Sequence, residues 1–454
     1  MLATATYASL LIGVFLIAGY LLVRLPILRR AFLPGSLIAG VLLLVAGPQI
    51  AGNYFPEWQL NIKFYEFWKI LPKQLINVVF ACLFLARPVL PITKMWKLAG
   101  PQVAFGQMMA WGQYLFGGLL TLLVLTPIFK VNPVMAALIE ISFEGGHGTA
   151  SGLGPVFAKI GFMEGQELAL GLATVSLCTA LISGVLLVNW GKRRHHIKEV
   201  HKQTARQRSY HRRIIYELNK QGIRLREHMT LRRVTSHLLL VASSVACGWL
   251  LYQGLLQLEN TTWAAKNSEL RFLQYVPIFP LSTFGGMIAH QIWKSFGFTV
   301  SRHLVELISS IALSVLIASA VATMSLNYIT QHITVFVLLA LTGILWIVFC
   351  FVFLARRMFR KNWFQNGIVN TAQSMGMTAT GLLFLHMVDP EDKTNSMESF
   401  GYKQLMFEPF VGGGIITAVS MPLIIQLGLT TFTLIAGCVC IFWLLIGLFY
   451  FGKK

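Results

Sequence analysis

Long apolar runs separated by short polar connections make up most of the chain. Each run has about 20 residues, enough to cross a hydrocarbon core of roughly 30 Å. We place these runs at 5–25, 33–50, 72–90, 102–128, 166–190, 235–257, 273–296, 303–325, 332–355, 403–425 and 429–451. Two further apolar stretches, 133–155 and 365–386, are rich in Gly, Thr and Ser. The pattern predicts an all-α polytopic membrane protein with about 11 transmembrane helices, because a spanning helix satisfies its own backbone groups in lipid.

Positive charge alternates between the connections. Lys and Arg follow every odd-numbered run, whereas the connections after even-numbered runs carry only scattered charges. Basic loops stay on the cytoplasmic side, so we expect a periplasmic N-terminus and a cytoplasmic C-terminus. All the basic connections lie on the same side only if 133–155 and 365–386 do not fully cross the membrane. The sequence therefore predicts two re-entrant hairpins, one entering from each side.

The connection 192–234 holds more than half of the chain's net charge of +20, with Lys or Arg outnumbering Glu several-fold. Such a block between two spans is first a topology signal, and it also suits anionic lipid headgroups. It contains no base-stacking motif, which argues against nucleic acid as a partner. We expect it to be a cytoplasmic loop that divides a first repeat, 1–191, from a second, 235–428. An extra helix at 429–454 follows.

Two short patterns recur in the same order in both halves. Segments 34–40 and 280–286 share P-x-S-x-x-x-G, and 149–153 (TASGL) matches 378–382 (TATGL). Each half has five spans, an odd number, so the second half must be inverted relative to the first. Inverted repeats with interrupted apolar segments in corresponding positions are typical of secondary transporters.

The two hairpins contain the candidate substrate-binding residues. Glycine allows sharp turns and close approach to a solute, a helix beginning near Thr149 would offer N–H groups to an anion, and hydroxyls add donors. The candidates are Gly145, Gly146, His147, Gly148, Thr149, Ser151, Ser374, Gly376, Thr378 and Thr380. Hairpin tips that meet near the midplane would form a polar site with little formal charge. Such a site suits a small anionic substrate that travels with a cation.

Acidic residues inside the apolar runs are few and expensive, at least about 2.5 kcal/mol each at a helix centre. The candidates are Glu140, Glu144 and Glu408. Each could carry a proton, bind a coupling cation or pair with a substrate ammonium, or could lie hydrated near an interface. Glu408 precedes a triple glycine beginning at Gly412, where free carbonyls could coordinate an ion.

Other classes of protein have weaker support. Glu144 and His147 form half of a carboxylate metal motif, but a second Glu-x-x-His is missing, so we expect no metal centre. An ion channel would need an acidic ring or a filter. An enzyme would need a nucleophile–base constellation, and we expect neither enzymatic activity nor a cofactor beyond sodium or a proton. A membrane receptor that has lost transport remains an alternative.

At these residues the chain resembles the glutamate:sodium symporter family. The motifs are GGHGT at 145–149, Pro34 with Gly40, 279–280 with Gly286, GMTAT at 376–380, and Pro409 with 411–412. The resemblance implies ten spans plus two hairpins, a homodimer, an elevator-type transporter, and sodium-coupled uptake of glutamate across the bacterial inner membrane.

The chain also departs from the family pattern. Glu144 replaces a small hydroxyl residue, Thr417 stands about where the family has a helix Asp, and 372–376 reads AQSMG instead of a Gly-His-Cys motif. Thr417 therefore joins Glu144, Glu408 and Gly412 as a candidate coupling-ion residue. These changes leave open a proton-coupled carrier of another organic anion.

Overall fold

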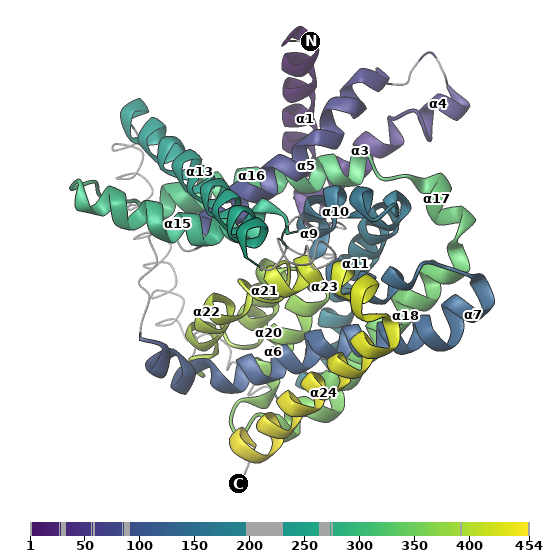
Figure 1. The fold of residues 1–454 in the computed structure, drawn as a ribbon, viewed down its shortest axis with the longest axis vertical. Helices are drawn as coiled ribbons and strands as arrows, with labels where there is room; N and C mark the ends of the chain where they lie inside the picture. The colour runs from purple at the N-terminus through teal and green to yellow at the C-terminus, as the bar shows by residue number, and fades with distance from the viewer. Residues whose placement is uncertain are drawn as a thin grey trace.

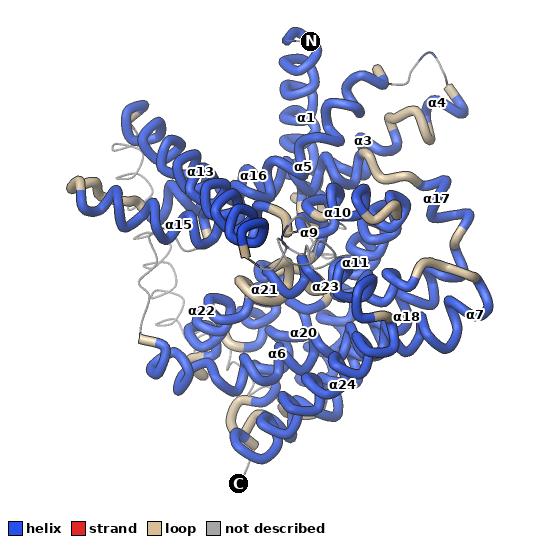
Figure 2. The backbone as a smooth tube through the Cα atoms, viewed as in Figure 1, coloured by secondary structure: helices blue, strands red, loops and turns tan. Residues whose placement is uncertain are grey.

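Every regular element that the structure describes is a helix (Figures 1 and 2). The structure is a computed structural model, and it describes residues 2–26, 28, 33–55, 57, 60–83, 85, 91–196, 230–262, 273, 276–390 and 393–452. Within these residues seven helices are long and apolar enough to cross a membrane. They are Ala3–Leu22, Thr93–Phe129, Met163–Arg193, Leu231–Thr261, Arg302–Ala322, Ile333–Met358 and Leu429–Phe451. The chain is therefore a multi-pass helical membrane protein.

The helices form two groups. The first, here called the wall group, lies in the upper part of Figure 1. It consists of α1 (Leu2–Leu22), α3 (Gly35–Val45), α5 (Ile62–Cys82), α13 (Leu231–Thr261), α15 (Ile278–Ser295) and α16 (Arg302–Ala322). The fully buried Trp68 ties α5 to α1, because its indole N–H donates to the carbonyl of Ala8 at 3.1 Å. The short helix α4 (Ala51–Tyr54) lies between α3 and α5 in the chain.

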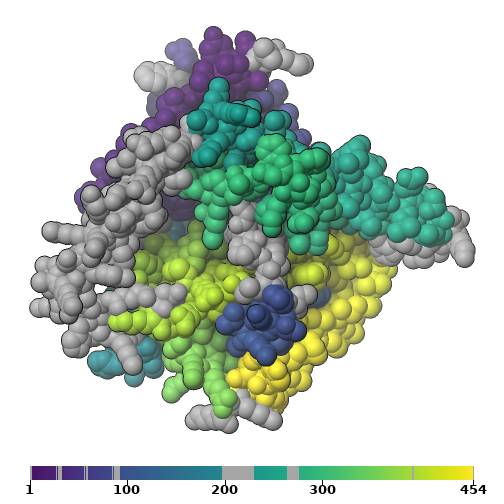
Figure 3. Space-filling model, turned by 90° about the vertical axis from the view of Figure 1, so that its left-hand side faces the viewer, coloured from purple at the N-terminus to yellow at the C-terminus, as the bar shows by residue number. Residues whose placement is uncertain are grey.

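The second group, here called the hairpin group, occupies the centre and the lower part of Figure 1, and Figure 3 shows the same division from the side. It consists of α6 (Ile92–Leu120), α8 (Leu138–Phe143), α9 (Gly146–Gly152), α10 (Gly154–Lys159), α11 (Met163–Arg193), α18 (Ile333–Phe349), α20 (Trp363–Ser374), α21 (Thr378–Val388), α22 (Ser396–Phe407), α23 (Ile415–Leu427) and α24 (Leu429–Leu445). Trp346 of α18 packs over Gly112 of α6 and donates to the carbonyl of Met109 at 2.9 Å.

Shorter elements extend or connect these helices. Turns of π-helix lengthen α6, α18 and α24, and a 3-10 turn precedes α8. The elements are η2 (Thr121–Leu125), η6 (Cys350–Ala355), η7 (Ile446–Phe451), η3 (Pro133–Ala137), α7 (Thr126–Phe129), α17 (Leu326–Gln331) and α19 (Arg356–Met358).

Both predicted Gly/Thr/Ser hairpins consist of two helices separated by a break. The first breaks between α8 and α9, where Gly146 has a φ of 69°, and the second between α20 and α21. The breaks lie against each other, since a Cβ placed on Gly146 would be 3.7 Å from the carbonyl oxygen of Gly376. Positive φ at Gly146 is a conformation that glycine adopts without the steric cost of a Cβ. The two hairpin tips therefore meet.

Some helices differ from the predicted runs. Helix α5 begins at Ile62 rather than at 72, because its first turns contain the charged side chains of Lys63, Glu66 and Lys69, which hid it from the hydropathy pattern. Helix α3 has only 11 residues. The run 403–425 is divided into α22 and α23 by a turn over 408–414. The backbone turns here because Gly412 and Gly413 have φ of 74° and 100°.

The repeated P-x-S-x-x-x-G segments place glycines at two corresponding helix crossings. A Cβ on Gly40 of α3 would lie 2.7 Å from the Cβ of Val321 on α16. A Cβ on Gly286 of α15 would lie 2.4 Å from the carbonyl oxygen of Ala81 on α5. Each glycine thus allows close packing between the two halves of the chain. In each case the partner helix, α16 or α5, is the third predicted span of the other half. Most of the basic block, 197–229, lies outside the described residues.

Candidate functional site

A cavity of about 250 Å³ lies between the wall group and the two hairpin tips. Its wall side is apolar and comes from α5 and α16. These residues are Ile76, Val79, Phe80, Leu83, Leu313 and Ile317. The opposite side is polar and is formed by the hairpins and the 404–412 region. These residues are Glu144, Gly145, Gly146, His147, Gly148, Gln373, Gly376, Met377, Thr378, Gln404, Glu408 and Gly412.

Glu144 lies at the end of α8 and accepts hydrogen bonds from side chains of α20 and α6. Its Oε1 accepts from the Gln373 side-chain amide at 2.8 Å, and its Oε2 accepts from Gln113 at 3.3 Å. The side chain is only 5% exposed. Because Gln373 belongs to the second hairpin, this acid joins the two halves of the chain.

Glu408 lies in the turn that follows α22. Its Oε1 accepts from the Thr378 hydroxyl at 2.8 Å and from the Gln404 amide at 2.6 Å. Gln404 also contacts the Thr378 hydroxyl at 2.7 Å. Thr378 is the first residue of α21, so Glu408 fixes the start of the second arm of that hairpin.

Lys403 connects the two acids through glutamines. Its ammonium group donates to Oε1 of Gln373 at 2.7 Å and to Oε1 of Gln404 at 2.8 Å. The side chain is fully buried. Lys403 begins the predicted run 403–425, where a lysine is expected to extend toward the interface, so the sequence pattern gave it no role. The available signal was a lysine five residues before an intramembrane acid, Glu408.

Glu140 forms a separate hydrogen-bonded centre next to the cavity. It accepts from the Tyr114 hydroxyl at 2.5 Å, the Thr417 hydroxyl at 2.8 Å and the backbone N–H of Gly412 at 3.0 Å. It has no exposed surface and does not line the cavity. Glu140 therefore ties α8 to the 408–414 turn, and Thr417, a predicted ion ligand, bonds to Glu140 instead of facing the cavity.

The remaining predicted site residues lie close behind the cavity. Thr149, Ser151, Ser374 and Thr380 are buried but do not line it. The hydroxyls of Thr149 and Ser151 have no hydrogen-bond partner among the described residues. Helix α9 begins at Gly146 and not near Thr149, which moves its first turn to the glycines that line the cavity.

His147 lines the cavity, and its ring forms a hydrogen bond with α11. Its Nε2 lies 2.9 Å from the hydroxyl of Thr174 on α11. The Thr174 hydroxyl in turn donates to the carbonyl of Leu170 at 3.0 Å. This hydroxyl can therefore only accept from the ring, so Nε2 carries the proton. The contact holds the first hairpin against α11.

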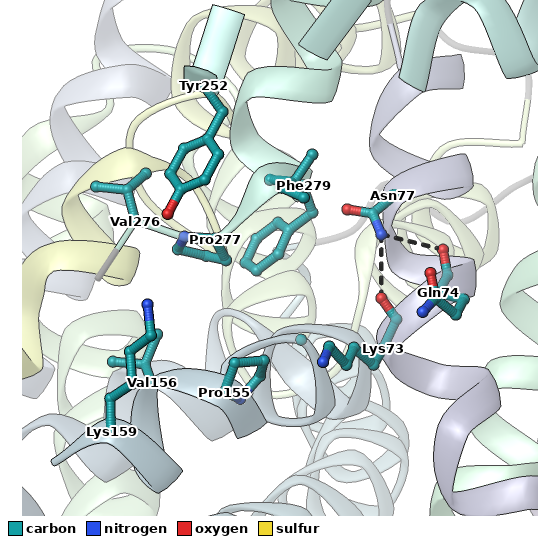
Figure 4. A pocket seen from close by; sticks show the side chains of 12 residues that line it. Lys73, Gln74, Asn77, Pro155, Val156, Lys159, Tyr252, Val276, Pro277 and Phe279 are labelled. Atoms are coloured by element: carbon teal, nitrogen blue, oxygen red, sulfur yellow. Dashed lines mark hydrogen bonds between the residues drawn. The ribbon is translucent and has the colours of Figure 1, made fainter. Parts of the chain in front are cut away.

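Figure 4 shows a second cavity, of about 360 Å³. Lys73 of α5 and Lys159 of α10 line it together with Tyr252 of α13. Phe279 lines this cavity, Phe80 lines the first, and their ring centroids are 4.9 Å apart in an edge-to-face arrangement. The pair therefore lies between a cavity lined by acids and one lined by lysines.

A helical membrane fold with paired hairpin tips around a small polar cavity fits a membrane transporter. A model of the family described as sodium/glutamate symporter matches residues 1–388. The chain belongs to the sodium/glutamate symporter family, which confirms the resemblance seen in its motifs. The family consists of symporters and is not a class of enzymes. No curated protein matches the chain at a significant level.

Proposed function

We propose that the chain is a cation-coupled symporter that carries glutamate or a related small carboxylate across the bacterial inner membrane, with sodium as the coupling ion. The main support is the cavity at the meeting point of the two hairpins, with Glu144 and Glu408 on its polar side. Its volume of about 250 Å³ suits a solute of amino-acid size. Membership of a family described as sodium/glutamate symporter supports glutamate as the substrate and sodium as the ion.

The polar side of the cavity offers separate groups to substrate and cation. Backbone N–H groups over 146–148, at the start of α9, are suited to a carboxylate. The Thr378 hydroxyl, which donates to Glu408, would hold that acid beside the substrate. Glu144 and Glu408 with carbonyls near Gly412 are suited to a hard cation, which prefers oxygen ligands. The predicted residues Thr149, Ser151, Ser374 and Thr380 would support the hairpins from behind, and Thr417 would orient Glu140.

A proton-coupled cycle is the second candidate. Two carboxylates face the same small cavity, and carboxylates in a transporter core serve as proton carriers as well as cation ligands. Protonation of either acid would reduce the repulsion of an anionic substrate. The experiment below separates sodium from proton coupling.

The transport movement we propose is of the elevator type. The hairpin group, with the cavity's polar side, would slide along the wall formed by α5 and α16. That wall is apolar at all six of its lining residues, so sliding breaks no side-chain hydrogen bond on that side. The corresponding glycine crossings at Gly40 and Gly286 support an inverted repeat of 1–191 and 235–428. We further propose a homodimer, with the 192–234 loop and the C-terminus in the cytoplasm.

Uptake of labelled glutamate into proteoliposomes tests this function. A sodium gradient should drive accumulation, and Glu144→Gln and Glu408→Gln should each reduce it at least about tenfold, as expected when about 1.4 kcal/mol or more of binding is lost. Glu306→Gln is the matched control, because Glu306 is an exposed acid on α16 that pairs with Arg302 at 2.7 Å. Its uptake should equal that of the unmodified protein.

Three other results would lead to different conclusions. Accumulation driven by a proton gradient alone would support proton coupling. A current far larger than the substrate flux would indicate a channel. Failure of either gradient to drive uptake of any amino acid or dicarboxylate would contradict symport and favour a receptor.

A further inference from the structure

Lys403 occupies a site that is shaped to hold a buried ammonium group. Two of its three N–H directions meet the carbonyls of Gln373 and Gln404, and its nitrogen lies 3.7 Å from the ring centroid of Phe407. Aromatic faces attract cations, most strongly where water is excluded. Phe400 contributes a second ring at 5.6 Å. The lysine has no exposed surface and does not line the cavity.

A glycine on α6 provides the space for this side chain. A Cβ on Gly106 would lie 2.7 Å from Cε of Lys403 and 3.1 Å from its Nζ. Contacts below 3.0 Å require a shift of one of the two groups. The lysine is thus enclosed by α6, α20 and α22, and its position is fixed by packing as well as by hydrogen bonds.

The lysine fixes the direction of a hydrogen-bond chain between the two acids. An ammonium group only donates, so both glutamines must present their carbonyl oxygens to it. Their amide N–H groups then point away, Gln373 toward Glu144 and Gln404 toward Glu408. Both acids are therefore held as hydrogen-bond acceptors. One acid comes from the first hairpin and the other from the end of α22.

The charges around the cavity do not balance within the described residues. Glu140, Glu144 and Glu408 each accept at least two hydrogen bonds, and Lys403 is the cation among them. Among the described residues, Glu144 and Glu408 are the charged groups that act on Lys403. Uncompensated charge is costly in a low-dielectric interior. Mobile cations, either sodium ions or protons, would neutralise the negative charge that the lysine does not balance.

We propose that Lys403 is a tethered cation of the coupling machinery, which replaces one mobile cation in each transport cycle. The inference rests on the proposed cation-coupled symport and makes it more specific. Because the lysine moves with the hairpins and returns with them, its charge produces no net transfer over a cycle. A carrier with Lys403 then needs one cation fewer than the same site without it.

Cation binding to purified protein in detergent tests the proposal without substrate. Bound sodium is counted by equilibrium dialysis with radioactive sodium, and protons taken up are counted by potentiometric titration. Lys403→Met keeps an unbranched side chain of similar length, which lies against the same aromatic rings. It should bind one cation more than the unmodified protein, whereas Glu408→Gln should bind one fewer.

Double variants separate charge from packing. Lys403→Met combined with Glu144→Gln or with Glu408→Gln restores the net charge but keeps the altered packing. Both double variants should return to the cation count of the unmodified protein. If Lys403 had only a structural role, Lys403→Met would keep the original count and each double variant would bind one cation fewer. An unchanged count in folded Lys403→Met would also overturn the proposal.

If Lys403→Met does not fold, the double variants test whether Lys403 acts through its charge. Folded double variants with the original count would support charge balance as the role of Lys403. Double variants that also fail to fold would overturn it.

Transport provides a second measurement. The charge moved per labelled glutamate, from the membrane potential at zero net flux, should rise by one elementary charge in Lys403→Met, and an unchanged ratio would contradict the proposal. If the unmodified protein moves no glutamate but the cation counts change as expected, the substrate assignment fails and the role of Lys403 stands.

Discussion

At the scale of single residues, two threonines that the sequence treats alike have different surroundings. Thr378 lines the cavity and bonds to Glu408, whereas Thr149 is buried behind it with no hydrogen-bond partner among the described residues. Thr378→Val should raise the apparent KM for substrate about tenfold or more, because it removes the hydrogen bond that holds Glu408 at the cavity, and a hydrogen bond to a charged group contributes about 1.5–3 kcal/mol. Initial rates of uptake over a range of glutamate concentrations measure this change.

Thr149→Val is the matched control for Thr378→Val. It removes a buried hydroxyl that makes no hydrogen bond, so the KM should stay within about twofold and the thermal stability should not fall. Equal increases of KM in both variants would show that both hydroxyls contact the substrate, as the symmetry of the sequence suggested.

The sequence singled out the segments that line the cavity but not the partners of each side chain. Gly145, His147, Gly376 and Thr378, which the sequence predicts to bind substrate, line the cavity. The hydrogen bonds that connect Glu144 through Lys403 to Glu408 join residues far apart in the sequence. Glu144 and Gln373, for example, are 229 positions apart. No local spacing encodes such a contact, so the role of Lys403 needed the three-dimensional structure.

At the scale of elements, the turn between α22 and α23 packs against the first hairpin. Gly413 has a φ of 100°, and a Cβ there would lie 2.4 Å from the Thr149 hydroxyl oxygen and 3.0 Å from the Phe80 ring. Gly413→Ala should therefore push the turn away from α9 and α5. We expect a strong loss of uptake, together with a loss of about 2–5 kcal/mol of stability from backbone strain and overpacking.

Gly428→Ala separates these two effects. Gly428 also has a positive φ, 82°, but no atom lies within 4 Å of the position of its Cβ. This variant should show the backbone strain alone, about 1–3 kcal/mol, and keep its uptake. Thermal unfolding in detergent and uptake are measured on both. If the two variants lose uptake equally, the contact between the turn and α9 does not matter for transport.

The elements themselves were partly visible in the sequence. Runs of uniform hydrophobicity such as α11 and α18 were located almost to their ends, because lipid-facing and core-facing positions are both apolar. The start of helix α5 was predicted too late in the sequence, because charged residues near its true start break the hydropathy pattern. The division of 403–425 into α22 and α23 depends on the glycine conformations of the turn, which hydropathy does not report.

At the scale of the whole molecule, an elevator movement predicts which crosslinks block transport. A Cβ on Gly148 of α9 would lie 2.7 Å from Cδ1 of Ile76 on α5, across the boundary between the two groups. In a background with the native cysteines replaced by alanine, a crosslink between cysteines at these two positions should stop uptake. Reduction should restore it. Uptake by the fully crosslinked protein would exclude sliding at this boundary.

A crosslink inside the hairpin group is the control. A Cβ on Gly437 of α24 would lie 3.2 Å from Cδ1 of Leu115 on α6, a geometry similar to that of the first pair. Cysteines at 115 and 437 should crosslink as readily and leave uptake unchanged, because α6 and α24 move together. A loss of uptake here would show that the hairpin group itself must deform.

The division into two groups follows from the sequence only in outline. Charge alternation and repeated motifs predict two related halves, but they do not indicate which helices of each half join which group. The exchange of contacts at Gly40 and Gly286, where each half packs on the other, became visible only in three dimensions.

The space that Gly106 leaves for Lys403 has an evolutionary consequence. A side chain at 106 would collide with the lysine, and the loss of the lysine would leave a void beside a glycine. The two positions, on α6 and α22, should therefore vary together among related sequences. Relatives with Lys at 403 should keep Gly at 106, and those with a small or apolar residue at 403 should tolerate a larger one at 106. This pair of residues would then distinguish members of the family that carry an internal cation from members that depend wholly on dissolved ions.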